Sequence, residues 1–247
     1  MLRDLVEFEQ RLSTIVSVES LSKDTESFTR TLGCRWFTLI RAASGGSDNP
    51  SLLMTNYPNG WVQRVLAERR HLSDPIHAAV SRSLDGVQWC EVDKVIKLNS
   101  HQRETLAIAS DHGLRNGFTI PVCLPGASSV MFSVALTEEK AMEPELILAT
   151  RILSGIVYAK ANKLEAEAQG LQRPVSLSPR QIECIRLIAQ GFTDHAIGQR
   201  LELSPETVRE YVEAARKRYG VKRRAQLVIR AIHDNYLTVE EAVDWSF

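Results

Sequence analysis

The chain has 247 residues, of which 44% are hydrophobic and 24% charged, and its formal net charge is zero. This is ordinary soluble globular composition, so it excludes a disordered, collagen-like or low-complexity chain. The length predicts one large or two small domains. No apolar run reaches the ~18 residues of a membrane helix, and the first residues mix acids into their apolar pattern, unlike a signal peptide. We therefore expect a cytoplasmic protein with no membrane partner.

The cysteines and histidines indicate no metal or catalytic centre. There is no CxxC pair, and no histidine lies near a cysteine at metal-ligand spacing, so neither a disulfide framework nor a zinc site is predicted. We expect Cys34, Cys90, Cys123 and Cys184 all to be buried thiols. HxH, HExxH and GxSxG motifs are absent. An enzyme is therefore not expected, and no cofactor is predicted.

The first 168 residues alternate between strand and helix patterns. Periodicity predicts strands at 36–43, 51–57, 87–92, 117–124 and 128–137. It predicts helices over 5–15, around 28–32, over 59–71, from Pro75, over 100–110 with Ser100 as the cap, and over 143–168. Turn residues fill 44–51 and the Pro125–Gly126 pair. Neighbouring strands joined by short turns favour an α+β fold, an α/β/α sandwich with an antiparallel sheet.

The remainder of the chain has an all-helical pattern. Residues 169–176 are expected to be a linker, because Gly170 and Pro174 interrupt the apolar periodicity. Residues 177–247 predict an all-α domain of four helices, with N-caps at Ser178, Thr193 and Ser204. The second and third of these helices are short and joined by a tight turn. They fit a helix-turn-helix, whose second helix enters the major groove of DNA.

Positive charge is concentrated in this domain. Residues 209–230 carry eight cations against two carboxylates, a local excess of six. The excess indicates DNA as a partner, although a solvated helix face is the alternative. Early in the third helix, Arg209 could donate two hydrogen bonds to a guanine, and a glutamate could accept one from a cytosine. The cations that come later are placed for contacts with phosphates. The predicted DNA-binding residues are Thr193, Ser204, Glu206, Thr207, Arg209, Glu210, Glu213, Arg216, Lys217, Lys222, Arg223 and Arg224.

Two stretches resemble one known architecture. Residues 177–228 resemble the LuxR-type DNA-binding domain, with Glu183, Gly191, Thr207 and Val208 among the matching positions and Gly198 where alanine is usual. The segments NYPNGW, DP, VQW and GFTIP, between residues 56 and 121, resemble the autoinducer-binding domain of quorum-sensing regulators. The resemblance implies an autoinducer-binding and dimerisation domain over 1–168 and a DNA-binding domain over 177–247.

The resemblance also implies a ligand and its contacts. The implied ligand is an N-acyl homoserine lactone. The Trp61 indole N–H would donate a hydrogen bond to its lactone carbonyl, and the Tyr57 hydroxyl would donate to its amide carbonyl. The Asp74 carboxylate would accept a hydrogen bond from its amide N–H. Trp89 and Gly117 match positions that shape the pocket. From the pattern alone, we expect the acyl chain to be walled by Leu39, Val65, Leu66, Ile76, Phe118 and Met131.

The same residues also fit other interpretations. Tyr57 and Trp61 could be ordinary core aromatics, and Asp74 could be only a helix cap. Val65 and Met131 replace an aromatic and a small hydroxyl residue of many relatives, which predicts an acyl chain unlike the short 3-oxo types, for instance a long one. The same changes allow a ligand-independent or antagonist regulator. A homodimer paired through the helices at 143–168 and 224–235 is expected, with RNA polymerase as a further candidate partner.

Overall fold

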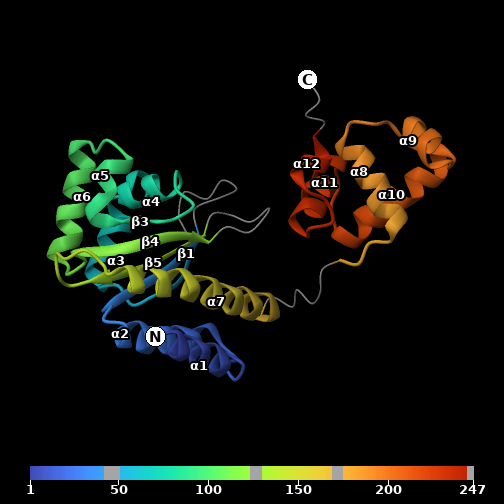
Figure 1. The fold of residues 1–247 in the computed structure, drawn as a ribbon. Coiled ribbons are helices and arrows are strands. Elements are labelled where there is room, and N and C mark those ends of the chain that lie inside the picture. Colours follow the sequence, from blue (N-terminus) through green and yellow to red (C-terminus); the bar gives the residue numbers. More distant parts are fainter. Residues whose placement is uncertain (42–50, 123–129, 169–174, 244–247) are drawn as a thin grey trace. The chain divides into compact units, whose positions relative to one another are not determined.

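The computed structural model describes residues 1–41, 51–122, 130–168 and 175–243 (Figure 1). The described residues form two compact units, 1–168 and 175–243. Most of the predicted turn at 44–51, the Pro125–Gly126 turn, Cys123 and residues 169–174 of the predicted linker lie outside them. No helix in the described ranges is long and apolar enough to span a membrane.

A five-stranded antiparallel sheet organises the first unit, in the order β2-β1-β5-β4-β3. Its strands are β1 (Trp36–Arg41), β2 (Ser51–Thr55), β3 (Val87–Gln88), β4 (Asn116–Val122) and β5 (Val130–Leu136). The central strand β5 is buried along its whole length, so its side chains pack on both faces of the sheet. The predicted antiparallel sheet is confirmed.

One face of the sheet packs against three helices, α1 (Leu2–Leu12), α2 (Val18–Thr31) and α7 (Pro144–Ala168) (Figure 1). Phe8 and Phe28 stack with ring centroids 4.6 Å apart, and Phe37 and Phe132 contribute from the sheet. These helices and the sheet enclose the largest apolar core of the unit. None of the residues of this core lines the cavity on the opposite face of the sheet.

The opposite face is covered by short helical segments (Figure 1). They are α3 (Asn59–Ala67), the 3-10 turn η1 (Arg70–Ser73), α4 (Pro75–Val80), the 3-10 turn η2 (Trp89–Glu91), α5 (Val92–Val95) and α6 (Ser100–Asp111). Helices on both faces confirm the α/β/α sandwich.

Several boundaries differ from the sequence prediction, among them the helix predicted over 5–15, which is Leu2–Leu12, and the one predicted around 28–32, which is Val18–Thr31. Three further differences have a local cause in the structure. The helix predicted over 59–71 is broken, because Arg69 adopts a left-handed φ of 51° between α3 and η1. The strand predicted over 87–92 ends at Gln88, since the Cys90 amide donates to the Asn116 side chain at 3.1 Å instead of to a backbone carbonyl of the neighbouring strand β4. The cap of α6 is Asn99 rather than Ser100, and Gln102 completes a capping box.

The second unit contains the four predicted helices, α8 (Pro179–Ala189), α9 (Asp194–Leu201), α10 (Pro205–Tyr219) and α11 (Arg224–His233). A further single-turn helix, α12 (Val239–Ala242), was not predicted. The side chains of Ser178, Thr193 and Ser204 cap their helices as predicted.

The thiols depart from the prediction at one position. Cys34 and Cys184 are buried, and burial raises the pKa of the Cys34 thiol to about 12. Cys90 is exposed, so the expectation that it is buried was wrong. Cys90 lies in the 3-10 turn η2, after the end of β3, so the alternation of side chains between the two faces of a strand does not apply to it. Its side chain therefore points outward.

Candidate functional site

A cavity in two parts lies between the sheet and the layer of short helices. The two parts have volumes of about 130 and 60 Å³. We call the larger the outer lobe and the smaller the inner lobe. Both are lined by Thr38, Tyr57, Trp61, Asp74 and His77, which therefore form the junction between them.

The two lobes differ in the chemistry of their walls. The outer lobe adds mainly aliphatic side chains: Ile40, Leu52, Val62, Val65 and Leu66, with Thr55 and His71. The inner lobe adds an indole, hydroxyls and small apolar groups: Pro75, Ile76, Trp89, Thr105, Leu106, Ala109, Leu114, Thr119 and Ser133. A molecule with a compact polar end and an apolar tail matches this division.

The sheet forms the cavity floor with a row of hydroxyl side chains. Register pairs Thr55 with Thr38, Thr38 with Ser133, and Ser133 with Thr119, so one hydroxyl residue stands on each of four neighbouring strands. Thr119 and Ser133 lie 2.8 Å apart, oxygen to oxygen. Because the row crosses both lobes, polar partners are available along an otherwise apolar floor.

Tyr57 is held at the junction by this row. Its backbone amide donates to Thr55 Oγ1 at 3.0 Å, and its hydroxyl hydrogen-bonds with Ser133. Burial raises the pKa of the phenol far above its ordinary value. The hydroxyl therefore stays protonated and can donate to a bound molecule at any physiological pH.

Trp61 and Asp74 complete the junction from separate elements. Trp61, in α3, is 7% exposed and packs against Ile108 and Leu114. Within the described ranges, its indole N–H has no protein acceptor, so it can donate to a ligand. Asp74 caps α4, with Oδ1 accepting from the amides of Ile76 at 2.8 Å and His77 at 3.1 Å. The cap uses one oxygen and leaves Oδ2 for a donor in the cavity.

Trp89 closes the inner lobe and Gly117 makes room for it. The Trp89 indole donates to Thr119 Oγ1 at 2.9 Å, which joins it to the hydroxyl row. Gly117 does not line either lobe. A Cβ at this position would lie 2.4 Å from the Val134 carbonyl oxygen and 3.0 Å from the Trp89 ring. Gly117 therefore shapes the cavity through the indole.

Gly117→Ala is expected to destabilise the first unit. The added methyl group meets a backbone oxygen of β5, so β4 or the indole must shift, and overpacking of this kind costs about 1–3 kcal/mol of the free energy of unfolding. Urea unfolding measures the loss. Gly60→Ala is the matched control, because its Cβ would make only an ordinary contact with His112 at 3.5 Å. Equal stability of the two variants would contradict the crowding argument.

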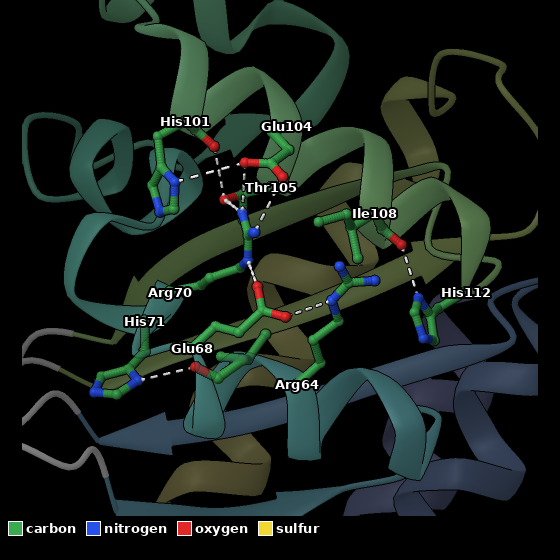
Figure 2. Close-up of polar contacts among 10 residues, drawn as sticks. Arg64, Glu68, Arg70, His71, His101, Glu104, Thr105, Ile108 and His112 are labelled. Atoms are coloured by element: carbon green, nitrogen blue, oxygen red, sulfur yellow. Dashed lines mark hydrogen bonds and ion pairs between the residues drawn. The ribbon is translucent and has the colours of Figure 1, made fainter.

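A buried arginine holds the segment that carries Asp74 (Figure 2). Arg70 in η1 donates to Glu68 at 2.6 Å and to Thr105 Oγ1 of α6 at 3.1 Å, and it lies 3.3 Å from Glu104. Glu68 also accepts from Arg64 at 2.8 Å. Figure 2 shows Glu68, at the end of α3, and Glu104 and Thr105 of α6 converging on the Arg70 guanidinium, with Arg64 on the far side of Glu68. The cluster ties η1 to α6 and offsets the strained backbone at residue 69.

Three of the predicted cavity walls are elsewhere. Leu39 and Phe118 point to the other face of the sheet, into the core formed with α1, α2 and α7, so their prediction as walls was wrong. Met131 is on the cavity side but packs with Ile76, Val80 and Val87, away from both lobes. Strand alternation is the physical reason for Leu39 and Phe118, since a shift of one residue reverses the face. Val65 and Leu66 line the outer lobe and Ile76 the inner lobe.

Sequence reasoning missed Ser133, Thr119 and His77. The hydroxyl expected near residue 131 stands two residues further on, at Ser133. Alternation along β5 could have identified it, because Ser133 shares a face with Met131. His77 carried no motif signal and is found only from the position of its helix.

The second unit presents the predicted helix-turn-helix. Glu202 ends α9 in a left-handed conformation with φ 56°, and the Leu203 amide donates to the Gly198 carbonyl at 2.9 Å. A Cβ at Gly198 would lie 2.6 Å from the Leu203 carbonyl oxygen, so the glycine suits this close turn. Val208, Val212 and Ala215 bury one side of α10 and leave the other to solvent.

The candidate DNA-contacting residues fall into two groups. Glu206, Arg209, Glu210, Lys217, Lys222 and Arg223 are exposed, and Thr193 and Ser204 stand at the helix N-termini. Thr207 and Glu213 are half-buried: the Thr207 hydroxyl contacts Ser204 at 3.0 Å, and Glu213 pairs with Arg216. Arg216 also donates to the Lys222 carbonyl, and Arg224 pairs with Asp194 at 2.8 Å. Both arginines therefore already have partners within the unit.

Comparisons with known proteins agree with both units. Residues 17–160 match the autoinducer binding domain family, and residues 175–231 match the bacterial regulatory proteins of the luxR family. A putative HTH-type transcriptional regulator of Sinorhizobium fredii is 24% identical over 83% of this chain, which spans 64% of that relative's length. The transcriptional activator AhyR of Aeromonas hydrophila is 21% identical, over 98% of this chain and 96% of its own.

Solved structures share the fold. Escherichia coli SdiA is similar with a TM-score of 0.73 at 20% identity, covering 95% of this chain and 98% of its own. SdiA in complex with octanoyl-rac-glycerol has a TM-score of 0.71 at 20% identity and covers 93% of each chain. The matched families are regulators of transcription and not enzymes.

Proposed function

The chain belongs to the LuxR family of transcriptional regulators that carry an autoinducer-binding domain, and from that premise we propose that it senses an N-acyl homoserine lactone and controls promoter DNA as a dimer. The domain boundaries that we propose are 1–168 for ligand binding and dimerisation, 169–176 for the linker and 177–247 for DNA binding.

The junction between the lobes carries the ligand proposal. Trp61 offers an N–H, Tyr57 offers a hydroxyl hydrogen, and Asp74 offers a carboxylate oxygen, all on the lining of one cavity. An acyl homoserine lactone has two carbonyl acceptors and one amide donor, so each group finds a complementary partner. Few polar groups in an otherwise apolar pocket are typical of small-molecule sites.

The two lobes give the ligand a direction. The lactone ring fits the inner lobe, where Trp89 and the hydroxyls of Thr119 and Ser133 gather. The acyl chain fits the outer lobe, which is lined by aliphatic side chains and bordered by the exposed Leu52 and Leu66. Both lobes are smaller than the ~300 Å³ at which ligand pockets begin. Binding therefore requires the junction side chains to separate, so that the lobes merge around the ligand.

The long helix α7 supplies a surface for a second copy. Its inner side is buried against the sheet, while Leu148 is 57% and Ile152 37% exposed on the outer side. Gly155 and Ala159 continue this exposed stripe with small residues that allow close approach. A two-fold dimer through this stripe would present two α10 helices to a palindromic operator.

Thermal denaturation with a panel of lactones, from butanoyl to tetradecanoyl, tests the ligand proposal. A ligand present at about 100 times its Kd stabilises the folded state by about 2.7 kcal/mol and raises the Tm. We expect a long acyl chain to give the largest shift. Trp61→Phe keeps the ring but removes the donor, and should weaken binding about tenfold. Octanoyl glycerol, which has no amide N–H or lactone, is the comparison ligand.

The outcomes separate the hypotheses. A largest shift with butanoyl or hexanoyl lactone would refute the long-chain prediction alone. If no lactone shifts the Tm and the soluble yield is the same with and without lactone, the protein is a ligand-independent or antagonist regulator. A shift with octanoyl glycerol only would reassign the ligand class.

A further inference from the structure

Two junction side chains, Thr38 and His77, have no role in the proposed ligand contacts, and the Thr38 hydroxyl already donates to the Met54 carbonyl. His77 lines both lobes together with Tyr57, Trp61 and Asp74. Its backbone is fixed from both directions: its amide donates to Asp74 Oδ1 at 3.1 Å, and its carbonyl accepts from the Ser81 amide at 3.1 Å. The backbone that carries the imidazole is therefore fixed three residues from the Asp74 carboxylate, and His77 borders both lobes.

The His77 imidazole and the Trp61 indole lack a hydrogen-bond partner within the described ranges, whereas the remaining polar groups of the outer lobe have one. Thr38 donates to the Met54 carbonyl at 3.2 Å and Thr55 to the Phe37 carbonyl at 3.2 Å. Nδ1 of His71 lies 3.4 Å from the Val65 carbonyl oxygen (Figure 2). A half-buried imidazole facing an apolar tail would lose hydrogen bonds to water when the ligand enters, which costs free energy unless the ligand replaces them.

The position of the ligand's amide locates the atom that meets His77. With the amide N–H on Asp74 and the amide carbonyl on Tyr57, the first carbons of the acyl chain pass through the junction. The third carbon lies two bonds beyond the carbonyl, where the chain leaves the junction for the outer lobe. Further along, the walls are mainly the aliphatic side chains of Ile40, Val62 and Leu66.

We propose that His77 selects acyl chains that carry an oxygen, as a hydroxyl or a keto group, on the third carbon. A neutral imidazole has one donor and one acceptor nitrogen, so it can donate to either group and can accept from a hydroxyl. This inference rests on the proposed lactone site and adds the chemical class of its acyl chain.

The test compares three lactones of equal chain length: unsubstituted, 3-hydroxy and 3-oxo. Affinities are measured by calorimetry on the full chain and on the variants His77→Val, His77→Gln and His101→Val. We expect the wild type to bind an oxygenated ligand about tenfold more tightly than the unsubstituted one, because this ratio corresponds to the net free energy of one hydrogen bond. His77→Val should abolish this ratio while binding the unsubstituted ligand at least as well, and His77→Gln should keep part of it.

His101→Val is the matched control, because its imidazole lines neither lobe and lies 3.7 Å from Glu104 (Figure 2). It should leave the ratio unchanged. A wild-type ratio below about twofold, or a His77→Val variant that keeps the ratio, would overturn the role of His77 and leave the lactone proposal in place. If the wild type binds none of the three ligands, both proposals fail. Should His77→Val not fold, the His77→Gln ratio decides.

Discussion

Asp74→Asn is expected to weaken lactone binding by about thirtyfold without lowering the stability of the ligand-free protein. Asparagine and aspartate are equally good N-caps, so Oδ1 of the new side chain can still accept from the amides of Ile76 and His77. The other end then presents N–H₂ where the carboxylate offered Oδ2. This N–H₂ group and the ligand's amide N–H are both donors, so the hydrogen bond to the charged carboxylate, which contributes about 2 kcal/mol, is lost. Calorimetry on the full chain measures the affinity and thermal denaturation the stability.

Asp74→Ala separates the two roles of this residue. It removes both the cap and the ligand contact, so the ligand-free protein should lose about 1 kcal/mol of stability as well as affinity. If Asp74→Asn kept the wild-type affinity, Asp74 would be only a helix cap and the proposed amide contact would be wrong. If both variants lost the same stability, the hydrogen bonds to Ile76 and His77 could not be what holds α4.

Arg209→Ala is expected to reduce binding to the preferred DNA duplex by about 10- to 100-fold and to relax base preference at one position. Arg209 lies early in α10, is exposed, and has no ion-pair partner among residues 175–243. Its guanidinium is therefore free to donate two hydrogen bonds to a guanine. A duplex selected by the wild type from a randomised library is the probe, and fluorescence anisotropy at several salt concentrations gives the affinity.

Lys217→Ala is the control for charge alone. Lys217 is exposed in the last turn of α10, where phosphate contacts are expected, so its loss should weaken all duplexes equally and reduce the salt slope by about one. The same uniform loss for Arg209→Ala would show that Arg209 contacts phosphate and not bases. Arg224→Ala is unsuitable here, because its pair with Asp194 joins α11 to α9 and the variant would confound folding with binding.

The second unit was the more predictable from sequence, because its signals are local. Ser178, Thr193 and Ser204 each stand just before an apolar repeat, and a cap bonds to amides only three residues away. What the sequence could not show is which cations are free. Arg216 and Arg209 look equivalent in the chain, yet Arg216 is bound to Glu213 and to the Lys222 carbonyl, since α10 and the turn after it meet there.

In the first unit, apolar periodicity and short motifs were enough to predict the α+β class and to single out Tyr57, Trp61 and Asp74, because both are properties of neighbouring residues. The face of each strand that lines the cavity could be assigned only from the folded sheet, in which Leu39 and Phe118 belong to the other core and Ser133, not Met131, is on the cavity lining. Those assignments depend on register between strands distant in the chain, where a shift of one residue reverses every side chain. His77 likewise became a candidate only when the cap at Asp74 set its helix against the sheet.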